Sequence, residues 1–229
     1  MITKKNDNDE FFSPYIFSLE TKPLKAIDSL FLALLPVAEK RMIHRGDSFL
    51  LGEDSTNAGI LLLDKGLLTH CQMPSDTFMQ TFSPPSLMGV IDGYKNFYDV
   101  PSSYRNYFYA ETDVTIFYVP LEVFVRIMDK ENLWHDISRL LAHRLLALSL
   151  KFQINTQSDA YEIIRTLIIE LWNYPEEYRG QIKLPHFIQR RSGVSRSRIM
   201  KILMDLKTGG YIETEHGKLT SLHKLPMSY

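Results

Sequence analysis

The spacing of apolar residues changes abruptly at Pro120, and this change limits the folds open to the chain. Between Met42 and Val119, short apolar runs alternate with turn residues such as Gly, Pro and Asp. That pattern is typical of short antiparallel strands. After Pro120, apolar residues recur every three or four positions, which is the spacing of helices. The sequence therefore predicts an α+β protein in which an N-terminal antiparallel β-roll is followed by helices.

The longest helical stretch runs from about Asn132 to Asn155 and carries a broad apolar stripe. A helix of this kind needs a partner surface, because most helical stability in proteins comes from packing. Either the stripe packs only on its own β-roll, or part of it pairs with a second copy of the chain, as in a coiled coil. Its position between two domains favours the pairing. The residues expected to dimerise are Leu133, Ile137, Leu141, Leu145, Leu148 and Phe152.

The stretch from Leu184 to Leu222 has the pattern of two short helices followed by a hairpin. Pro185 suits the first turn of a helix, because its missing N–H has no helical acceptor there. A second helix is expected over Arg196 to Thr208, with Ser195 as its N-cap and Gly209-Gly210 as its end. Two helices around a tight turn, followed by a two-stranded wing, form a winged helix-turn-helix.

Basic charge is concentrated in this stretch, although the whole chain carries a net charge of −1. Between Lys183 and Lys201 there are six Lys or Arg residues and no Asp or Glu. A basic run is usually a solvated surface, but this run lies on the second helix of the motif, which the major groove admits. The pattern favours DNA binding, and the residues expected to contact DNA are Ser192, Ser195, Arg196, Ser197, Arg198, Lys201, Arg190, Arg191 and Lys218.

Polar residues from Gln153 to Asp159 mark the expected hinge between two domains. Asp159 or Ser158 can cap the next helix, with Glu162 completing a capping box. Four regions follow: an N-terminal tail over 1–22, a sensor-like β-roll over 23–130, a dimerisation helix and hinge over 131–156, and the winged helix-turn-helix over 157–229.

Several classes of function find little support in the sequence. The single cysteine, Cys71, excludes an intrachain disulfide and is expected to be a small buried hydrophobe, with a redox switch as the alternative. The longest apolar run is too short to cross a bilayer, so we expect a cytoplasmic protein without a membrane partner. We find no catalytic Ser-His-Asp order, paired carboxylates, phosphate loop or His-x-His pair. We therefore expect no enzyme, no metal site and no cofactor.

The order of these elements resembles the catabolite activator protein/FNR (CRP/FNR) family over about residues 24–225. The matching segments are IHRGD at 43–47, ILLLDKG at 60–66 and, most specifically, GVSRSRIMKIL at 193–203. The resemblance implies a cyclic-nucleotide-binding-like jelly roll and a homodimeric transcription regulator that binds double-stranded DNA, with RNA polymerase as a further partner. Within the family the likeness is to a stress-response group, which implies that role.

The resemblance places three base-reading positions on Arg196, Ser197 and Lys201. The family usually has Glu at the second position, which accepts a hydrogen bond from cytosine, and Arg at the third. Ser197 cannot accept as well, and Lys201 lacks the bidentate fork of Arg. The operator should therefore differ from the family's best-known one. The same departures leave open a dimeric ligand-binding or protein-interaction adaptor that has lost specific DNA binding.

The sensor region departs further from the family. A cyclic-nucleotide cassette needs Gly-Glu-(Leu/Ile) and then Arg-(Ser/Thr)-Ala, but Val90 stands where the Glu would be, and Arg105 is the only downstream Arg of that region. A buried phosphate without its Arg is costly, so the sequence argues against cyclic nucleotide. The roll holds either an apolar small molecule or a filled core. The expected lining is Leu61, Leu63, Leu87, Met88, Val90, Tyr107 and Tyr109.

Overall fold

The computed structural model describes residues 14–51, 58–101 and 105–229, and two compact units divide the chain. The first, called the roll unit here, comprises residues 23–142 and 176–182. The second, called the C-terminal unit, comprises residues 1–22, 143–175 and 183–229. The long helix α5 (Trp134–Gln157) belongs to both, because the division falls between Ala142 and His143.

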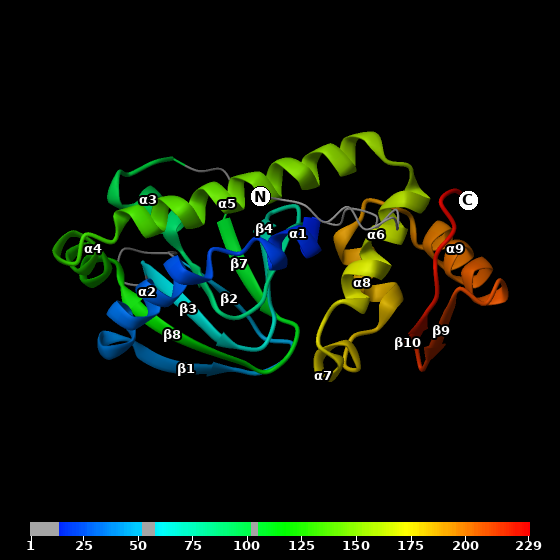
Figure 1. The fold of residues 1–229 in the computed structure, drawn as a ribbon, viewed down its shortest axis with the longest axis horizontal. Coiled ribbons are helices and arrows are strands. Elements are labelled where there is room, and N and C mark those ends of the chain that lie inside the picture. The colour runs from blue at the N-terminus through cyan, green and yellow to red at the C-terminus, as the bar shows by residue number, and fades with distance from the viewer. Residues whose placement is uncertain (1–13, 52–57, 102–104) are drawn as a thin grey trace. The chain divides into compact units, whose positions relative to one another are not determined.

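The described strands of the roll unit form two four-stranded antiparallel sheets (Figure 1). One sheet has the order β1 (Glu39–Ile43), β8 (Val114–Pro120), β3 (Gly59–Lys65) and β6 (Ser86–Met88). The other has the order β2 (Ser48–Leu50), β7 (Arg105–Ala110), β4 (Leu68–Met73) and β5 (Thr77–Phe82). The antiparallel β-roll predicted from the sequence is therefore confirmed.

Strand β3 is buried on both faces, which explains its unbroken run of apolar residues. Leu61 and Leu63 pack in the core that contains Phe108 of the opposite sheet. Ile60 and Leu62 point the other way, into a second core with helices α2 (Leu24–Leu34) and α4 (Leu121–Lys130) and the beginning of α5. Successive side chains of a strand point to opposite faces, so one strand serves both cores.

Three short elements complete the described part of this unit. They are the 3-10 helix η1 (Leu35–Val37) and the helices α3 (Val90–Phe97) and α7 (Glu176–Arg179). Gly66 makes the turn after β3 with φ +86, and a Cβ there would lie 2.3 Å from the backbone oxygen of Asp113. Glycine is therefore required at this turn.

The C-terminal unit contains the predicted winged helix-turn-helix. Its described elements are α1 (Pro14–Glu20), the second part of α5, α6 (Ala160–Trp172), α8 (Leu184–Arg191), α9 (Arg196–Thr208), β9 (Ile212–Glu215) and β10 (Lys218–Leu222). The capping box of α6 is present. The Asp159 carboxylate accepts from the amides of Tyr161 and Glu162 at 2.7 and 2.9 Å, and the Glu162 side chain accepts from the Asp159 amide.

Helix α1 corrects the prediction of an N-terminal tail over 1–22, because residues 14–20 are helical. A helix of seven residues is too short to be stable by itself in water. Packing within its unit stabilises it: the Tyr15 ring lies 4.9 Å from that of Tyr174, and Phe17 stacks on His143. The sequence predicts a polar loop from Gly52 to Gly59 and a strand that begins at Tyr104. Residues 52–57 of that loop and Tyr104 lie outside the described residues.

Candidate nucleic-acid interface and the roll interior

Helix α9 has one buried face and one face open to solvent. Ile199, Ile202, Leu203 and Leu206 are buried at the three- and four-residue spacing of a helix side. Phe187 of α8 is buried as well. This packing leaves the opposite side of α9 exposed.

The exposed side of α9 carries basic, hydroxyl and thioether groups. Arg196, Ser197 and Lys201 are all exposed, as base-reading residues must be. Met200 and Met204 are also exposed, at 48% and 69% of their surface. The sequence predicted the three polar residues, but a methionine at helical spacing could equally have been a core residue. Only the burial of the side chain in the structure decides whether a methionine belongs to the core or to the exposed face.

The N-terminal end of α9 is open. The first helical bond runs from the Ile199 amide to the Ser195 carbonyl, so the amides of residues 196–198 have no acceptor within the helix. Ser195 holds the N-cap position, as predicted, but its hydroxyl makes no capping bond and lies 3.3 Å from that of Ser197. Exposed amides at the positive end of a helix favour an anion such as phosphate.

Arg191 differs from the sequence prediction, because it is buried, with 7% of its surface exposed. Its guanidinium carbon lies 3.8 Å from the Phe187 ring centroid, and its Nε lies 3.9 Å from Glu170 Oε1. The Tyr174 hydroxyl donates to the same Glu170 oxygen at 2.9 Å. Arg191 is therefore a structural cation that joins α8 to α6. The sequence does not indicate this role, because Arg190 next to it is the same type of residue.

The other residues expected at the interface are accessible to different degrees. Arg198 is exposed, whereas Arg190 and Lys218 are half-buried. Ser192 is half-buried and donates to the Ile188 carbonyl at 2.9 Å. The wing is anchored at its turn, where the Leu184 amide donates to the Gly217 carbonyl at 2.8 Å.

The C-terminal residues pack back onto this domain, which the sequence did not indicate. Leu225 is buried, and the Tyr161 hydroxyl donates to the Pro226 carbonyl at 2.7 Å. The Tyr229 hydroxyl donates to Asp205, and this bond raises the pKa of Tyr229. Asp205 is the one acidic residue of α9, so Tyr229 engages the carboxylate that α9 itself carries.

The apolar stripe of α5 is divided between two environments. Ile137 is buried in the roll core and Leu133 packs against it, so these two expected dimer residues serve their own unit. Leu141 is exposed, Leu145 is 66% exposed and Phe152 is 71% exposed, whereas Leu148 is half-buried. The apolar surface that is open to a partner therefore runs from Leu141 through Leu145 to Phe152.

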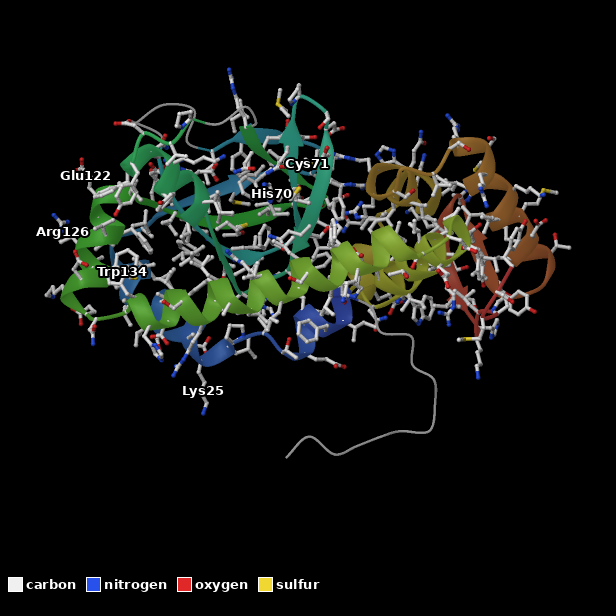
Figure 2. All side chains as sticks on the ribbon, turned by 90° about the horizontal axis from the view of Figure 1, so that it is seen from above. Lys25, His70, Cys71, Glu122, Arg126 and Trp134 are labelled. Atoms are coloured by element: carbon white, nitrogen blue, oxygen red, sulfur yellow. The ribbon has the colours of Figure 1, made fainter. Side chains whose placement is uncertain are left out.

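A chain of polar side chains occupies the roll interior beside α3. The Asn106 amide donates to Asp92 Oδ1 at 2.7 Å, and His70 Nε2 lies 2.9 Å from Asn106 Oδ1. The His70 ring stacks on Phe108 at 5.3 Å between centroids, and Figure 2 shows His70 beside Cys71 on β4. Burial raises the pKa of the Asp92 carboxyl. Cys71 is 1% exposed, which closes its thiol to solvent in this conformation.

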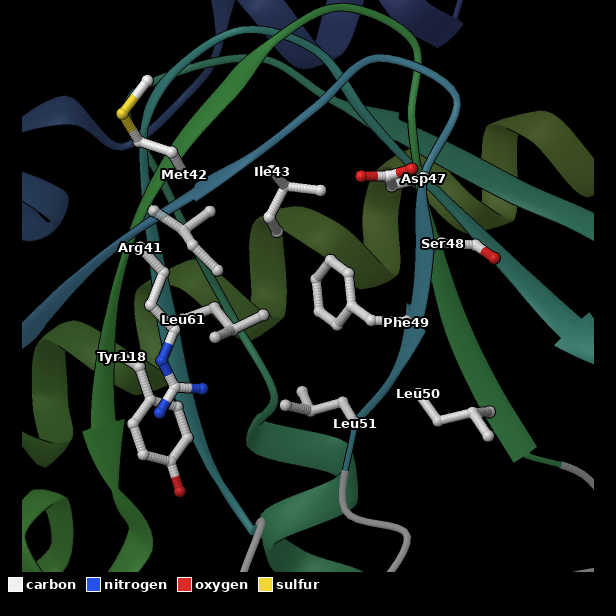
Figure 3. Close-up of a pocket in the computed structure, with 11 residues that line it drawn as sticks. Arg41, Met42, Ile43, Asp47, Ser48, Phe49, Leu50, Leu51, Leu61 and Tyr118 are labelled. Carbon is white, nitrogen blue, oxygen red and sulfur yellow. The ribbon is translucent and has the colours of Figure 1, made fainter.

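The prediction that seven roll residues line one pocket is wrong. Leu61, Leu63 and Met88 pack between the two sheets, whereas Leu87 and Val90 pack with the helices on the other face. Tyr107 and Tyr109 alternate with the buried Asn106 and Phe108, so they point to the other side of their sheet. Of the seven, Leu61 is the residue that lines an open cavity beside β1 and β2 (Figure 3).

The comparisons with known proteins agree with this geometry. Residues 160–227 match a family described as winged helix-turn-helix DNA binding. The c-di-GMP responsive regulator CLP of Xanthomonas campestris has a TM-score of 0.68 at 14% identity, covering 86% of this chain and all of that one. A CRP/FNR-family transcriptional regulator from Thermus thermophilus has a TM-score of 0.58 at 16% identity, covering 81% and 94%. The chain has the fold of the CRP/FNR regulators.

A sequence relative narrows the likeness within this fold. The chain is 26% identical over 209 residues to the Escherichia coli K12 protein named "Inhibitor of hydrogen peroxide resistance" (IprA), covering 91% of this chain and 98% of that protein. A Salmonella typhimurium protein of the same name is 30% identical over 103 residues, which is 45% of this chain and half of that protein. No described helix is both long and apolar enough to span a membrane.

Proposed function

We propose that this chain, with its CRP/FNR fold, is a sequence-specific transcription regulator that binds double-stranded DNA as a homodimer in the cytoplasm. The observation that carries the proposal is the exposed face of α9, where Arg196, Ser197 and Lys201 lie beside an open helix N-terminus. The run from Lys183 to Lys201 has no acidic residue. Such a face suits the major groove, where bases and phosphates are both within reach.

The residues of α9 differ in what they can read. Arg196 can donate two bonds to guanine, and Lys201 can donate to guanine as a point charge. The thioethers of Met200 and Met204 have no strong donor and suit the 5-methyl group of thymine. The residues assigned to phosphate contacts are Arg190, Arg198, Lys218 and, through their hydroxyls, Ser192 and Ser195.

The exposed apolar side chains between Leu141 and Phe152 of α5 support dimerisation. Leu141, Leu145 and Phe152 recur at four and seven residues on a continuous helix, so they share one side of it. Pairing with a second copy would remove this apolar surface from water. Two α9 helices related by a two-fold axis would then read half-sites about 34–36 Å apart.

The roll unit is proposed to be a sensor that does not bind cyclic nucleotide. Its interior beside α3 holds a buried carboxylate, Asp92, bonded to Asn106, and a phosphate would meet that charge. Arg105 is exposed, because it alternates with the inward-facing Asn106. The name of the Escherichia coli relative supports a role in the response to peroxide stress, with RNA polymerase as the further partner of a regulator.

The test is selection of bound sequences from random duplexes, followed by affinity measurement on the selected site. Arg196→Ala should weaken the selected site by about 1–3 kcal/mol more than random DNA. Replacing a contacted thymine by uracil should weaken binding by the wild type but not by Met200→Ala. Affinity should fall steeply as salt rises.

Other outcomes of the same experiment would contradict the proposal. Failure to enrich any sequence, with affinity insensitive to salt, would favour the adaptor alternative, in which the winged helix contacts protein. An equal loss for Arg196→Ala on selected and random DNA would remove Arg196 from base reading.

A further inference from the structure

The roll unit has an open cavity of about 760 Å³ beside the edge strands β1 and β2 (Figure 3). Its walls come from β1, β2, β3 and β8 and from residues next to β2. None of the eleven described lining residues lies between Gly89 and Asn106, where the family's nucleotide cassette would be. The volume is in the range that holds a small organic molecule, about 300–1,000 Å³.

Eight of the eleven described lining residues have apolar or aromatic side chains, but one inward position of β1 holds a cation. Arg41 pairs with Ile116 in the register of β1 and β8, so its side chain shares a face with Ile116 and Tyr118. Both of these neighbours are buried in the core between the sheets. The Arg41 guanidinium carbon lies 4.1 Å from the Tyr118 ring centroid. An arginine thus stands where the core face of a roll ordinarily has an aliphatic side chain.

The present partner of Arg41 is a carboxylate that a ligand can replace. Glu39, two residues earlier on the same strand, accepts from Arg41 Nε at 3.2 Å and from its terminal nitrogen at 2.9 Å. The Arg41 side chain is 44% exposed and the Glu39 side chain is 64% exposed. An ion pair in contact with water contributes little to stability, so exchanging Glu39 for another carboxylate costs little.

The charges on the lining select one kind of ligand. Arg41 and the acidic Asp47 both line the cavity, and the apolar side chains of Ile43, Phe49 and Leu61 lie between them in Figure 3. A carboxylate is favoured at Arg41 and disfavoured at Asp47. A molecule with one carboxylate and an apolar body satisfies both ends, whereas a dicarboxylate does not.

We propose that this cavity binds small monocarboxylates with an apolar body, whose carboxylate replaces Glu39 on Arg41 while the body packs on Phe49 and Leu61. The site deepens the sensor role proposed for the roll unit. Its occupancy is measured without DNA, so failure of DNA binding and failure of this site are separate results.

Calorimetry on the full chain tests the site, with octanoate as the probe. Octanoate should bind once per chain. Octanol should bind at least about tenfold more weakly, because it lacks the charged hydrogen bond to Arg41. Octanedioate should also bind more weakly, because its second carboxylate meets Asp47. Arg41→Met should weaken octanoate about tenfold and leave octanol unchanged. Glu39→Gln should strengthen octanoate binding, because it removes the competing carboxylate.

Lys40→Met is the matched control, because Lys40 is exposed and pairs with Phe117, so it faces the opposite side of β1. It removes the same charge and should leave octanoate binding unchanged. The proposal is overturned if octanoate does not bind, if octanol binds as tightly, or if Lys40→Met weakens octanoate as much as Arg41→Met. Unchanged or weaker octanoate binding by Glu39→Gln, a variant that keeps Arg41 and the fold of β1, overturns it as well.

Discussion

Arg191→Met should destabilise the C-terminal unit without acting through DNA contacts. Arg191 is 7% exposed, packs on the Phe187 ring and lies 3.9 Å from Glu170. Removing one partner of a buried ion pair costs about 3–5 kcal/mol, because the other charge stays buried. Glu170 still accepts from Tyr174 at 2.9 Å, and its pair with Arg191 is long. We therefore expect the lower end, about 3 kcal/mol.

Hydrogen exchange of the amides in α6 and α8 measures this loss directly, because it reports the free energy of opening of those helices. Glu170→Gln combined with Arg191→Met should cost less than Arg191→Met alone, since no charge is then left buried. Arg196→Ala, on the exposed face of α9, is the control and should weaken DNA binding with little change in exchange. If Arg191→Met kept wild-type exchange and weakened DNA binding, Arg191 would be a surface contact and this reasoning would be refuted.

Three further predictions concern other parts of the chain. Leu145→Glu should convert the dimer to monomer in sedimentation, whereas Arg139→Glu on another side of α5 should not; a dimeric Leu145→Glu would exclude this stripe. Asp159→Ala should lower the free energy of unfolding by about 1 kcal/mol in urea, and an unchanged midpoint would contradict the cap. Burial raises the pKa of the Asp92 carboxyl in the folded chain. Its ionisation therefore opposes folding once the pH rises above the pKa that this carboxyl has in the unfolded chain. Asp92→Asn should therefore stabilise the roll at neutral pH and not at acidic pH, and equal stabilisation at both would contradict this.

The sequence by itself determined the elements whose causes are local. The capping box of Asp159 and Glu162 depends on residues three apart, and it forms as predicted. The glycine turn after β3 and the second helix of the winged motif also follow from residues next to one another. The alternation of apolar runs and turns was sufficient for the antiparallel roll, because both sheets bury one face on the other.

The tertiary structure alone decided which chemically equivalent residues are buried. Arg190 and Arg191 are neighbours of the same type, yet Arg191 is the one that packs on Phe187 beside Glu170, 21 residues earlier in the chain. Leu133 and Leu145 belong to one apolar stripe, yet the first packs on the roll and the second is exposed. Arg41 acquires its place in a cavity wall only through its pairing with β8. Burial is set by neighbours distant in sequence, so local spacing predicts the elements but not which of their side chains remain accessible to DNA, a ligand or a second copy.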